Sequence, residues 1–557
     1  MLMVGAWSAL VFLVNPVGDF PLNDDWSYSR SVETLIDHGR LQFTAFNSMT
    51  LIAQVGWGAL FCLPFGFSFL SLRLSTLVLG ALGIVAAYLL LREVRVNRQT
   101  ALLGASLVAI NPLYFSLSFT FMTDVPFVAV SMLSLLFFVR SFRTDSPRDI
   151  IVGYAFATLA ILIRQNAAIL PVAFAISYVL MHGLRRRAIA YGLLPLAAEL
   201  VLVAAYPVVI AHTIGLPFYY ISARGVYGEV AAGLARDWLH VLGVTGDRLL
   251  VETLYLGLFL LPLTIVMGWL PRAISDWRRP RRLWAGSALA VAVGVLVLGR
   301  GRVMPLSGNV FYDLGLGPPL LRDTYVLGLH HLPGAPRGFW LAVTVAAVIG
   351  TVPLVRSVLA VGLRAAAATT SGSGKLEPAM LCVWIVGVGY LVNTAITTST
   401  PRYASFDRYF IFALVPLMMV LAHGRSNPPG KEDWPAFSAA ILLTLAFGAF
   451  SVGATHDYLA WNRARWNAGR DLLRQGVSSK HINGGFEFNG WYGYNPSRPL
   501  ESLESLWIHG DEYLISFGPV NGYSEVRSYP YRRWMPWGQG RVVVLRRHAQ
   551  QERGVAG

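Results

Sequence analysis

Long apolar stretches recur along most of this chain, and they constrain its fold more than any other feature. Each runs for about twenty residues, which is long enough for a helix to cross the hydrocarbon core of a membrane. A membrane-spanning barrel would instead show short segments of alternating polarity. Only 13% of the 557 residues are charged, whereas a soluble chain carries about 25%. The sequence therefore predicts an α-helical polytopic membrane protein.

Hydropathy predicts about thirteen membrane-spanning helices. Their ranges are 1–17, 73–91, 100–117, 126–140, 150–164, 167–183, 189–211, 249–270, 284–299, 338–357, 378–396, 409–423 and 434–454. The segment 51–70 is apolar too, but Gln54, Pro64 and several glycines interrupt it. We expect a re-entrant or surface-lying helix there.

The basic residues predict how the chain lies in the membrane. The formal net charge of +15 would suggest nucleic acid as a partner of a soluble protein. Here, arginine clusters such as 92–98 and 185–187 fall in short loops on one side, which the positive-inside rule makes cytoplasmic. The first loop (18–72) and the loops 212–248 and 300–337 are then expected outside. We predict a multi-pass protein of the inner (plasma) membrane that contacts membrane lipids and binds no nucleic acid.

Composition changes near residue 455, where the chain becomes polar and aromatic. The predicted elements there are a helix at His456–Gln475 and strands at Gly485–Trp491, Glu512–Phe517, Ser524–Ser528 and Gly540–Leu545. They indicate a membrane domain over 1–454 and a small extracytoplasmic (periplasmic) α/β domain over 455–557. The aromatic residues of the second domain suit either the stacking of sugars or the domain's own core.

Three acids stand at predicted membrane boundaries on the outer side. Asp24 and Asp25 are adjacent in Asn23-Asp24-Asp25-Trp26, and Asp124 follows Thr123 before Val125-Pro126. Acids at a membrane surface are costly to desolvate and usually serve chemistry. The first pair could instead cap the helix that starts at Trp26. The third acid on the same side favours a catalytic role for Asp24, Asp25 and Asp124.

Five arginines lie on the same predicted side as these acids. They are Arg73, Arg164, Arg322, Arg402 and Arg408. Any one of them could be an anchor that reaches toward the membrane surface, but together they predict a site for a phosphate, which the guanidinium fork binds well. Asp24 and Asp124 could also share a divalent cation such as Mg²⁺ or Mn²⁺, since hard metals prefer oxygen ligands.

Acids beside phosphate-binding arginines fit the transfer of a group from a lipid phosphate. A carboxylate would take the proton from an acceptor hydroxyl, and the arginines would stabilise the charge that grows on the departing phosphate.

These residues also resemble, in the same order, a known superfamily. Asp24-Asp25, Thr123-Asp124-Val125-Pro126 and Arg164-Gln165 are similar to motifs of the GT-C polyprenyl-phosphate-sugar glycosyltransferases. These include protein O-mannosyltransferases, lipid A aminoarabinose transferases and lipopolysaccharide galacturonosyltransferase-like enzymes. The resemblance covers residues 20–170 and, more loosely, Asp407-Arg408-Tyr409. The predicted helices followed by an α/β domain are similar to the aminoarabinose-transferase architecture.

The resemblance implies a GT-C fold, Asp24 as the base, and Asp124 as a residue that orients substrate or metal. Where aminoarabinose transferases carry a lysine in the first loop, this chain has Met49-Thr50-Leu51, while Arg164 retains a cation. That departure argues against aminoarabinose as the substrate.

The favoured hypothesis is a glycosyltransferase that uses a polyprenyl-phosphate-linked sugar donor. Its extracytoplasmic acceptor would be a lipid, a glycan or a protein. One alternative is a transporter or flippase of an anionic lipid-linked substrate, although transporters favour charges near the membrane midplane. Another is a non-catalytic scaffold or an O-antigen-type ligase.

Overall fold

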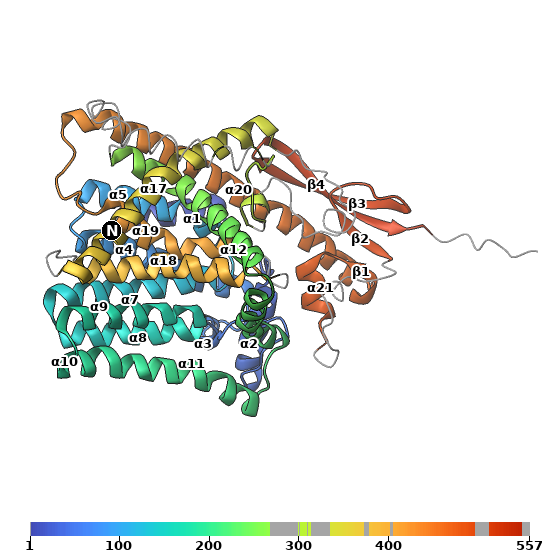
Figure 1. The fold of residues 1–557 in the computed structure, drawn as a ribbon. Helices are drawn as coiled ribbons and strands as arrows, with labels where there is room; N and C mark the ends of the chain where they lie inside the picture. Colours follow the sequence, from blue (N-terminus) through green and yellow to red (C-terminus); the bar gives the residue numbers. More distant parts are fainter. Residues whose placement is uncertain are drawn as a thin grey trace, which may run out of the picture.

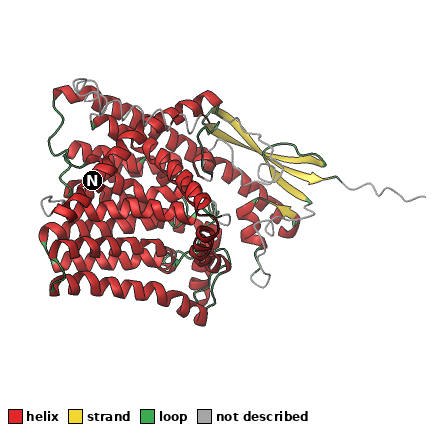
Figure 2. Cartoon of the chain, viewed as in Figure 1, coloured by secondary structure: helices red, strands yellow, loops and turns green. Residues whose placement is uncertain are grey.

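The computed structural model is a bundle of helices with a small sheet at one end (Figures 1 and 2). It describes residues 2–267, 301–308, 310–313, 335–371, 378–400, 405–495 and 512–548, and the single positions 294 and 299. The predicted helix at 284–299 and the phosphate-binding candidates Arg322 and Arg402 lie essentially outside the described residues.

The long helices of the bundle run side by side across it (Figure 1). In chain order they are α1 (Leu2–Val14), α4 (Phe69–Glu93), α5 (Arg98–Ala109), α7 (Asp124–Thr144), α8 (Pro147–Ile163), α9 (Ile169–His182), α11 (Leu194–Thr213), α12 (Phe218–Val266), α17 (Arg337–Ser371), α18 (Pro378–Thr397), α19 (Ile411–Ala422) and α20 (Trp434–Arg474). Shorter helices connect them: α2 (Asp25–His38), α3 (Ile52–Cys62), α6 (Pro112–Leu117), α10 (Arg186–Ala188) and α15 (Val310–Asp313). The 3-10 turns η1 (Gln165–Ala168) and η4 (Asp407–Phe410) precede α9 and α19.

The fold class is confirmed, whereas the number of spans is not. Among the described residues, eight helices are long and apolar enough to cross a membrane. They match eight of the predicted ranges. The predicted helices at 1–17, 150–164 and 409–423 form the shorter helices α1, α8 and α19. The range 100–117 is divided into α5 and α6, because Asn111 caps a new helix with Pro112 at its first position.

Two predicted outer segments form helices. The segment 51–70 contains α3, of 11 residues, which is too short to span. The long loop expected at 212–248 is wrong, because α12 already begins at Phe218 and continues beyond a kink at Asp237. The part before the kink exposes apolar side chains such as Ile221 and Tyr227, which suits contact with a membrane surface.

The C-terminal sheet domain comprises α21 (Phe486–Gly493) and four strands, packed on the end of α20 (Figure 1). The strands are β1 (Ile482–Asn483), β2 (Tyr513–Ser516), β3 (Tyr523–Trp534) and β4 (Trp537–Arg547), in the spatial order β1-β2-β4-β3. Strand β1 pairs with β2 in parallel, and the other pairs are antiparallel. Three of the four predicted strands are confirmed. The strand predicted at Gly485–Trp491 is wrong, because those residues form α21.

The predicted helix at His456–Gln475 is the second half of α20, which runs without a break through the predicted domain boundary at 454. Its buried face includes Tyr458, Trp461 and Leu472. The boundary itself stays a prediction.

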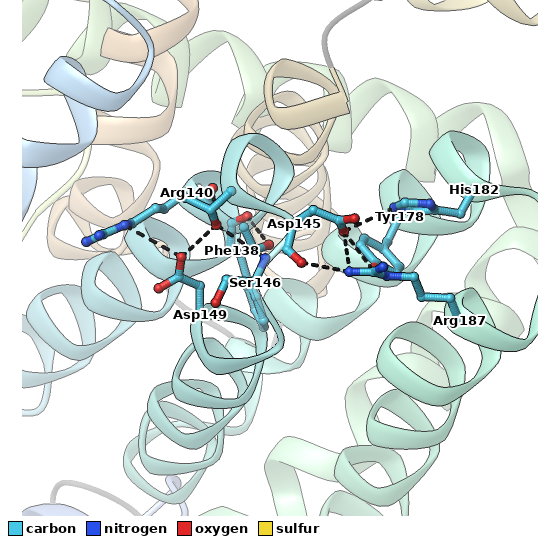
Figure 3. Close-up of polar contacts among 10 residues, drawn as sticks. Phe138, Arg140, Asp145, Ser146, Asp149, Tyr178, His182 and Arg187 are labelled. Atoms are coloured by element: carbon cyan, nitrogen blue, oxygen red, sulfur yellow. Dashed lines mark hydrogen bonds and ion pairs between the residues drawn. The ribbon is translucent and has the colours of Figure 1, made fainter.

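Helix α7 separates two groups of charges by the length of a membrane span. Asp124 begins it, and Asp145 ends it in a left-handed conformation with φ 49°. At that far end the Asp145 carboxylate pairs with Arg187 at 2.9 Å, and Arg140 pairs with Asp149 at 3.6 Å (Figure 3). Twenty-one residues of helix measure about 30 Å, close to the thickness of the hydrocarbon core. The arginine-rich ends therefore lie away from Asp124.

Candidate active site

The first candidate acid, Asp24, lies immediately before α2 and reaches across to η4. Its side chain does not cap α2. Instead Oδ2 of Asp24 accepts a hydrogen bond from Nη2 of Arg408 at 3.0 Å. The Asp24 side chain is 28% exposed, whereas that of Arg408 is 5% exposed. Arg408 thus holds one carboxylate oxygen of Asp24, while part of the Asp24 side chain remains exposed.

Asp25, its neighbour, is occupied within the fold. Oδ1 accepts from the backbone N–H of Leu22 at 2.5 Å, and Oδ2 accepts from that of Phe121 at 3.0 Å. Burial raises the pKa of Asp25 well above its ordinary value, against the lowering effect of these two bonds. Asp25 therefore ties the first loop to the segment before α7, and both of its carboxylate oxygens are used in doing so.

Asp124 forms a second ion pair, with Arg164 at the end of α8. Oδ1 of Asp124 accepts from Nη2 of Arg164 at 2.8 Å, and Nε of Arg164 donates to Thr123 Oγ1 at 2.7 Å. Both side chains are buried. Oδ2 of Asp124 has no hydrogen-bond partner among the described residues. Arg164 takes an extended conformation, φ −143° and ψ 127°, which ends α8 and directs the side chain toward the start of α7.

The two ion pairs belong to one cluster. The hydroxyl of Tyr28, one turn into α2, interacts electrostatically with Asp24, Asp124, Arg164 and Arg408. The hydroxyl of Tyr409, next to Arg408, interacts with the same four groups. Two acids and two arginines thus lie together, although members of the cluster are up to 384 residues apart in the chain. They come from the starts of α2 and α7, the end of α8 and η4.

Arg73, another candidate, is not part of this cluster. It is buried in α4, and its guanidinium makes four hydrogen bonds to backbone carbonyls. The acceptors are Pro16, Gly18, Phe20 and Phe119. Arg73 therefore fixes the start of the first loop against the segment before α7. With so many donors in use, its geometry favours a structural role over phosphate binding.

The segment 48–51 lies against the end of α8. The backbone N–H of Leu51 donates to the carbonyl of Ile163 at 3.1 Å, and Nε2 of Gln165 donates to the carbonyl of Ser48 at 3.2 Å. The resemblance to aminoarabinose transferases aligns their first-loop lysine with this segment. The chain therefore lacks that lysine beside Arg164.

Sequence reasoning missed Glu252, which lies in α12 and is fully buried. Neither of its carboxylate oxygens has a hydrogen-bond partner among the described residues. Tyr390 of α18 interacts electrostatically with Glu252 and also with Asp124 and Arg164. The signal that could have identified Glu252 is its position as a lone acid in the apolar run from Leu249. The tyrosines of the cluster gave no such signal, since tyrosine is common at membrane boundaries.

The residues present fit a divalent cation poorly. The described part of the chain holds no group of three or more His, Cys, Asp or Glu residues placed to bind a metal. Asp24 and Asp124 are each paired with an arginine, and a guanidinium at that position competes with a cation for the same oxygen.

Comparison with known proteins gives one family match. Residues 57–211 match the model of the dolichyl-phosphate-mannose-protein mannosyltransferase family. The matched segment includes Asp124 and Arg164, and it ends before Arg408. No curated protein matches the chain.

Solved structures of ArnT from Cupriavidus metallidurans also align with the chain. The structure bound to undecaprenyl phosphate is 13% identical, with 98% of this chain and 97% of that chain covered and a TM-score of 0.41. The apo structure is 13% identical over the same shares, with a TM-score of 0.36.

Proposed function

We propose that this chain is a membrane glycosyltransferase of the GT-C kind, which moves a sugar from a polyprenyl-phosphate carrier to a hydroxyl of an extracytoplasmic acceptor. The observation that carries the proposal is the cluster of two ion pairs, Asp24–Arg408 and Asp124–Arg164. One carboxylate of the cluster is partly exposed, and both arginines are buried beside it. That arrangement supports a role for Asp24 as a base beside cations that suit a phosphate.

Asp24 acts as the general base in this proposal. The acceptor oxygen attacks the anomeric carbon of the sugar while its proton passes to the carboxylate of Asp24. The bond between the anomeric carbon and the phosphate oxygen breaks, and the phosphate leaves with the electron pair. Nη2 of Arg408 lies 3.0 Å from Asp24 Oδ2, and the planar guanidinium fork fixes the direction in which Asp24 points.

Arg164 and Arg408 stabilise the departing phosphate. Arg164 uses Nε and Nη2 for Thr123 and Asp124, and its Nη1 makes no hydrogen bond to any residue that the structure describes. This group can donate to a phosphate oxygen without breaking the pair. Asp124 is then a positioning residue, because it orients the guanidinium and balances its charge before the donor binds.

The active site and the C-terminal sheet domain lie on the outer side of the membrane in this proposal, supported by the arginines that gather at the far end of α7. The membrane is the inner (plasma) membrane, and the acceptor is a lipid, a glycan or a protein of the cell envelope.

Mass spectrometry of envelope lipids and glycans tests the proposal directly. A deletion strain should lack one sugar-bearing species, and expression of the wild-type chain should restore it. Expression of Asp24→Asn to the same level in the membrane should not. An unchanged set of glycosylated species in the deletion strain would contradict the proposal.

A further inference from the structure

The C-terminal sheet domain contacts the first loop at the residue next to Asp24. Glu487, in α21, uses its two carboxylate oxygens for different partners. Oε1 accepts from the backbone N–H of Asn23 at 2.9 Å, and Oε2 accepts from Nη1 of Arg465 in α20 at 2.7 Å. The side chains of Glu487 and Arg465 are 0% and 1% exposed. A buried ion pair thus bears directly on the loop that presents Asp24.

Asn23 has an unusual backbone conformation that this contact helps to hold. Its φ is 58°, in the left-handed region that L-residues with a side chain adopt only rarely, although asparagine tolerates it better than most. The turn at Asn23 sets the direction of the next residue, Asp24. If the acceptor were removed, a buried backbone N–H would lose its bond and the turn would lose one of its restraints.

Side chains that pack around the hydrogen bond between Glu487 and Asn23 extend the contact between α2 and α21. Trp26 is fully buried, with its ring 6.2 Å from that of Phe486 and 5.7 Å from that of Tyr494. Arg30 donates to the carbonyl of Trp491, and its guanidinium lies 4.5 Å from the centre of that ring. Figure 1 shows α2 and α21 at the same end of the bundle. The sheet domain therefore packs directly against the start of α2.

A buried ion pair is weak evidence for stability, because the cost of desolvation offsets the attraction. Two apolar side chains would fill the same space. What they cannot do is accept a hydrogen bond from Asn23. The hydrogen bond to the backbone of Asn23 therefore explains why a carboxylate is buried at position 487.

We propose that Glu487 is a positioning residue for Asp24, so that the C-terminal sheet domain forms part of the active site. This inference rests on the proposed role of Asp24 as the base. It assigns to the domain a function in catalysis that is separate from any choice of acceptor. The expected consequence is a loss in kcat without a matching change in KM for the donor.

Two double variants that differ only in the acceptor atom test the proposal. In Glu487→Gln/Arg465→Met the side-chain amide oxygen can still accept from Asn23, whereas in Glu487→Met/Arg465→Met it cannot. Neither variant leaves an unpaired buried charge. The first should keep kcat within about threefold of wild type, and the second should lose about tenfold or more, which corresponds to about 1.4 kcal/mol of transition-state stabilisation. KM for the donor should stay within about twofold in both.

Hydrogen exchange of the backbone amides in the segment 20–26 gives a readout that does not need activity. Exchange should be faster in the Met/Met variant than in the Gln/Met variant. The control is Glu525→Gln, which removes one partner of the exposed ion pair between Glu525 and Arg541 on neighbouring strands, 3.1 Å apart, and should change neither quantity.

Equal kcat in the two double variants, or equal exchange in this segment, would overturn the inference. Absence of transfer by the wild-type protein would contradict the proposed function instead, while the exchange measurement would still report on the contact.

Discussion

At the scale of single residues, the structure separates acids and arginines that look alike in the sequence. Asp24 and Asp25 are neighbours, yet only Asp24 meets an arginine of the cluster, while Asp25 holds two backbone N–H groups. Arg73 and Arg164 both stand at predicted membrane boundaries, yet Arg73 binds carbonyls and Arg164 binds Asp124. The charge was predictable from the sequence. The partner was not, because it comes from segments far away in the chain.

Replacement of Arg164 by alanine should weaken the binding of the donor phosphate. A charge-assisted hydrogen bond contributes about 1.5–3 kcal/mol, so the dissociation constant for a polyprenyl phosphate should rise by about tenfold or more. Asp124 would also be left as an unpaired buried charge, so the apparent melting temperature should fall. Titration of the protein in lipid nanodiscs with the phosphate measures the first effect. Arg98→Ala, at an exposed position, is the control, and an unchanged dissociation constant in Arg164→Ala would remove Arg164 from the site.

At the scale of elements, helix ends create the cluster. Asp24 precedes α2, Asp124 starts α7, Arg164 ends α8 and Arg408 lies in η4 before α19. Hydropathy predicted most of these boundaries, since each coincides with a change from polar to apolar sequence. It could not predict α21, because the aromatic run Phe486–Gly493 also suits a strand, and the contact of this segment with the first loop comes from far away in the chain.

The contact between α21 and the first loop requires a glycine at position 490. A Cβ atom there would lie 2.4 Å from Cε2 of Trp26, so Gly490→Ala should push α21 away from the start of α2. The expected result is a fall in kcat and in the apparent melting temperature. Gly493→Ala, in the same helix, is a matched control because no atom lies within 4 Å of its Cβ position. Equal behaviour of the two variants would contradict the packing described here.

At the scale of the whole molecule, the polytopic helical fold and the C-terminal sheet were predictable, because long apolar runs and alternating strands leave clear patterns. The number of spans was not. Several predicted ranges form helices of only 12 or 13 residues, such as α19 and α1. Part of the apolar range at 409–423 lies in the 3-10 turn η4 instead, which hydropathy does not distinguish from an α-helix. The helix at 218–236 was also missed, since charged residues and glycines interrupt its apolar sequence.

The proposed orientation in the membrane predicts the reaction of cysteines placed on opposite sides. The native Cys62 and Cys382 are buried, so they should give little background. Val526→Cys, in the C-terminal sheet and 56% exposed, should react with an impermeant thiol reagent added to intact cells. Arg185→Cys, exposed at the arginine-rich end, should react only after the membrane is opened. The reverse pattern would place the cluster on the cytoplasmic side.

The most direct test of the central claim is the turnover of Asp24→Asn with a polyprenyl-phosphate sugar and an acceptor identified from the envelope analysis. The amide cannot take the acceptor's proton, so kcat should fall by about 10²–10⁴-fold, while the donor still binds and the protein keeps its apparent melting temperature. An Asp24→Asn variant that transfers sugar at the wild-type rate would contradict the account.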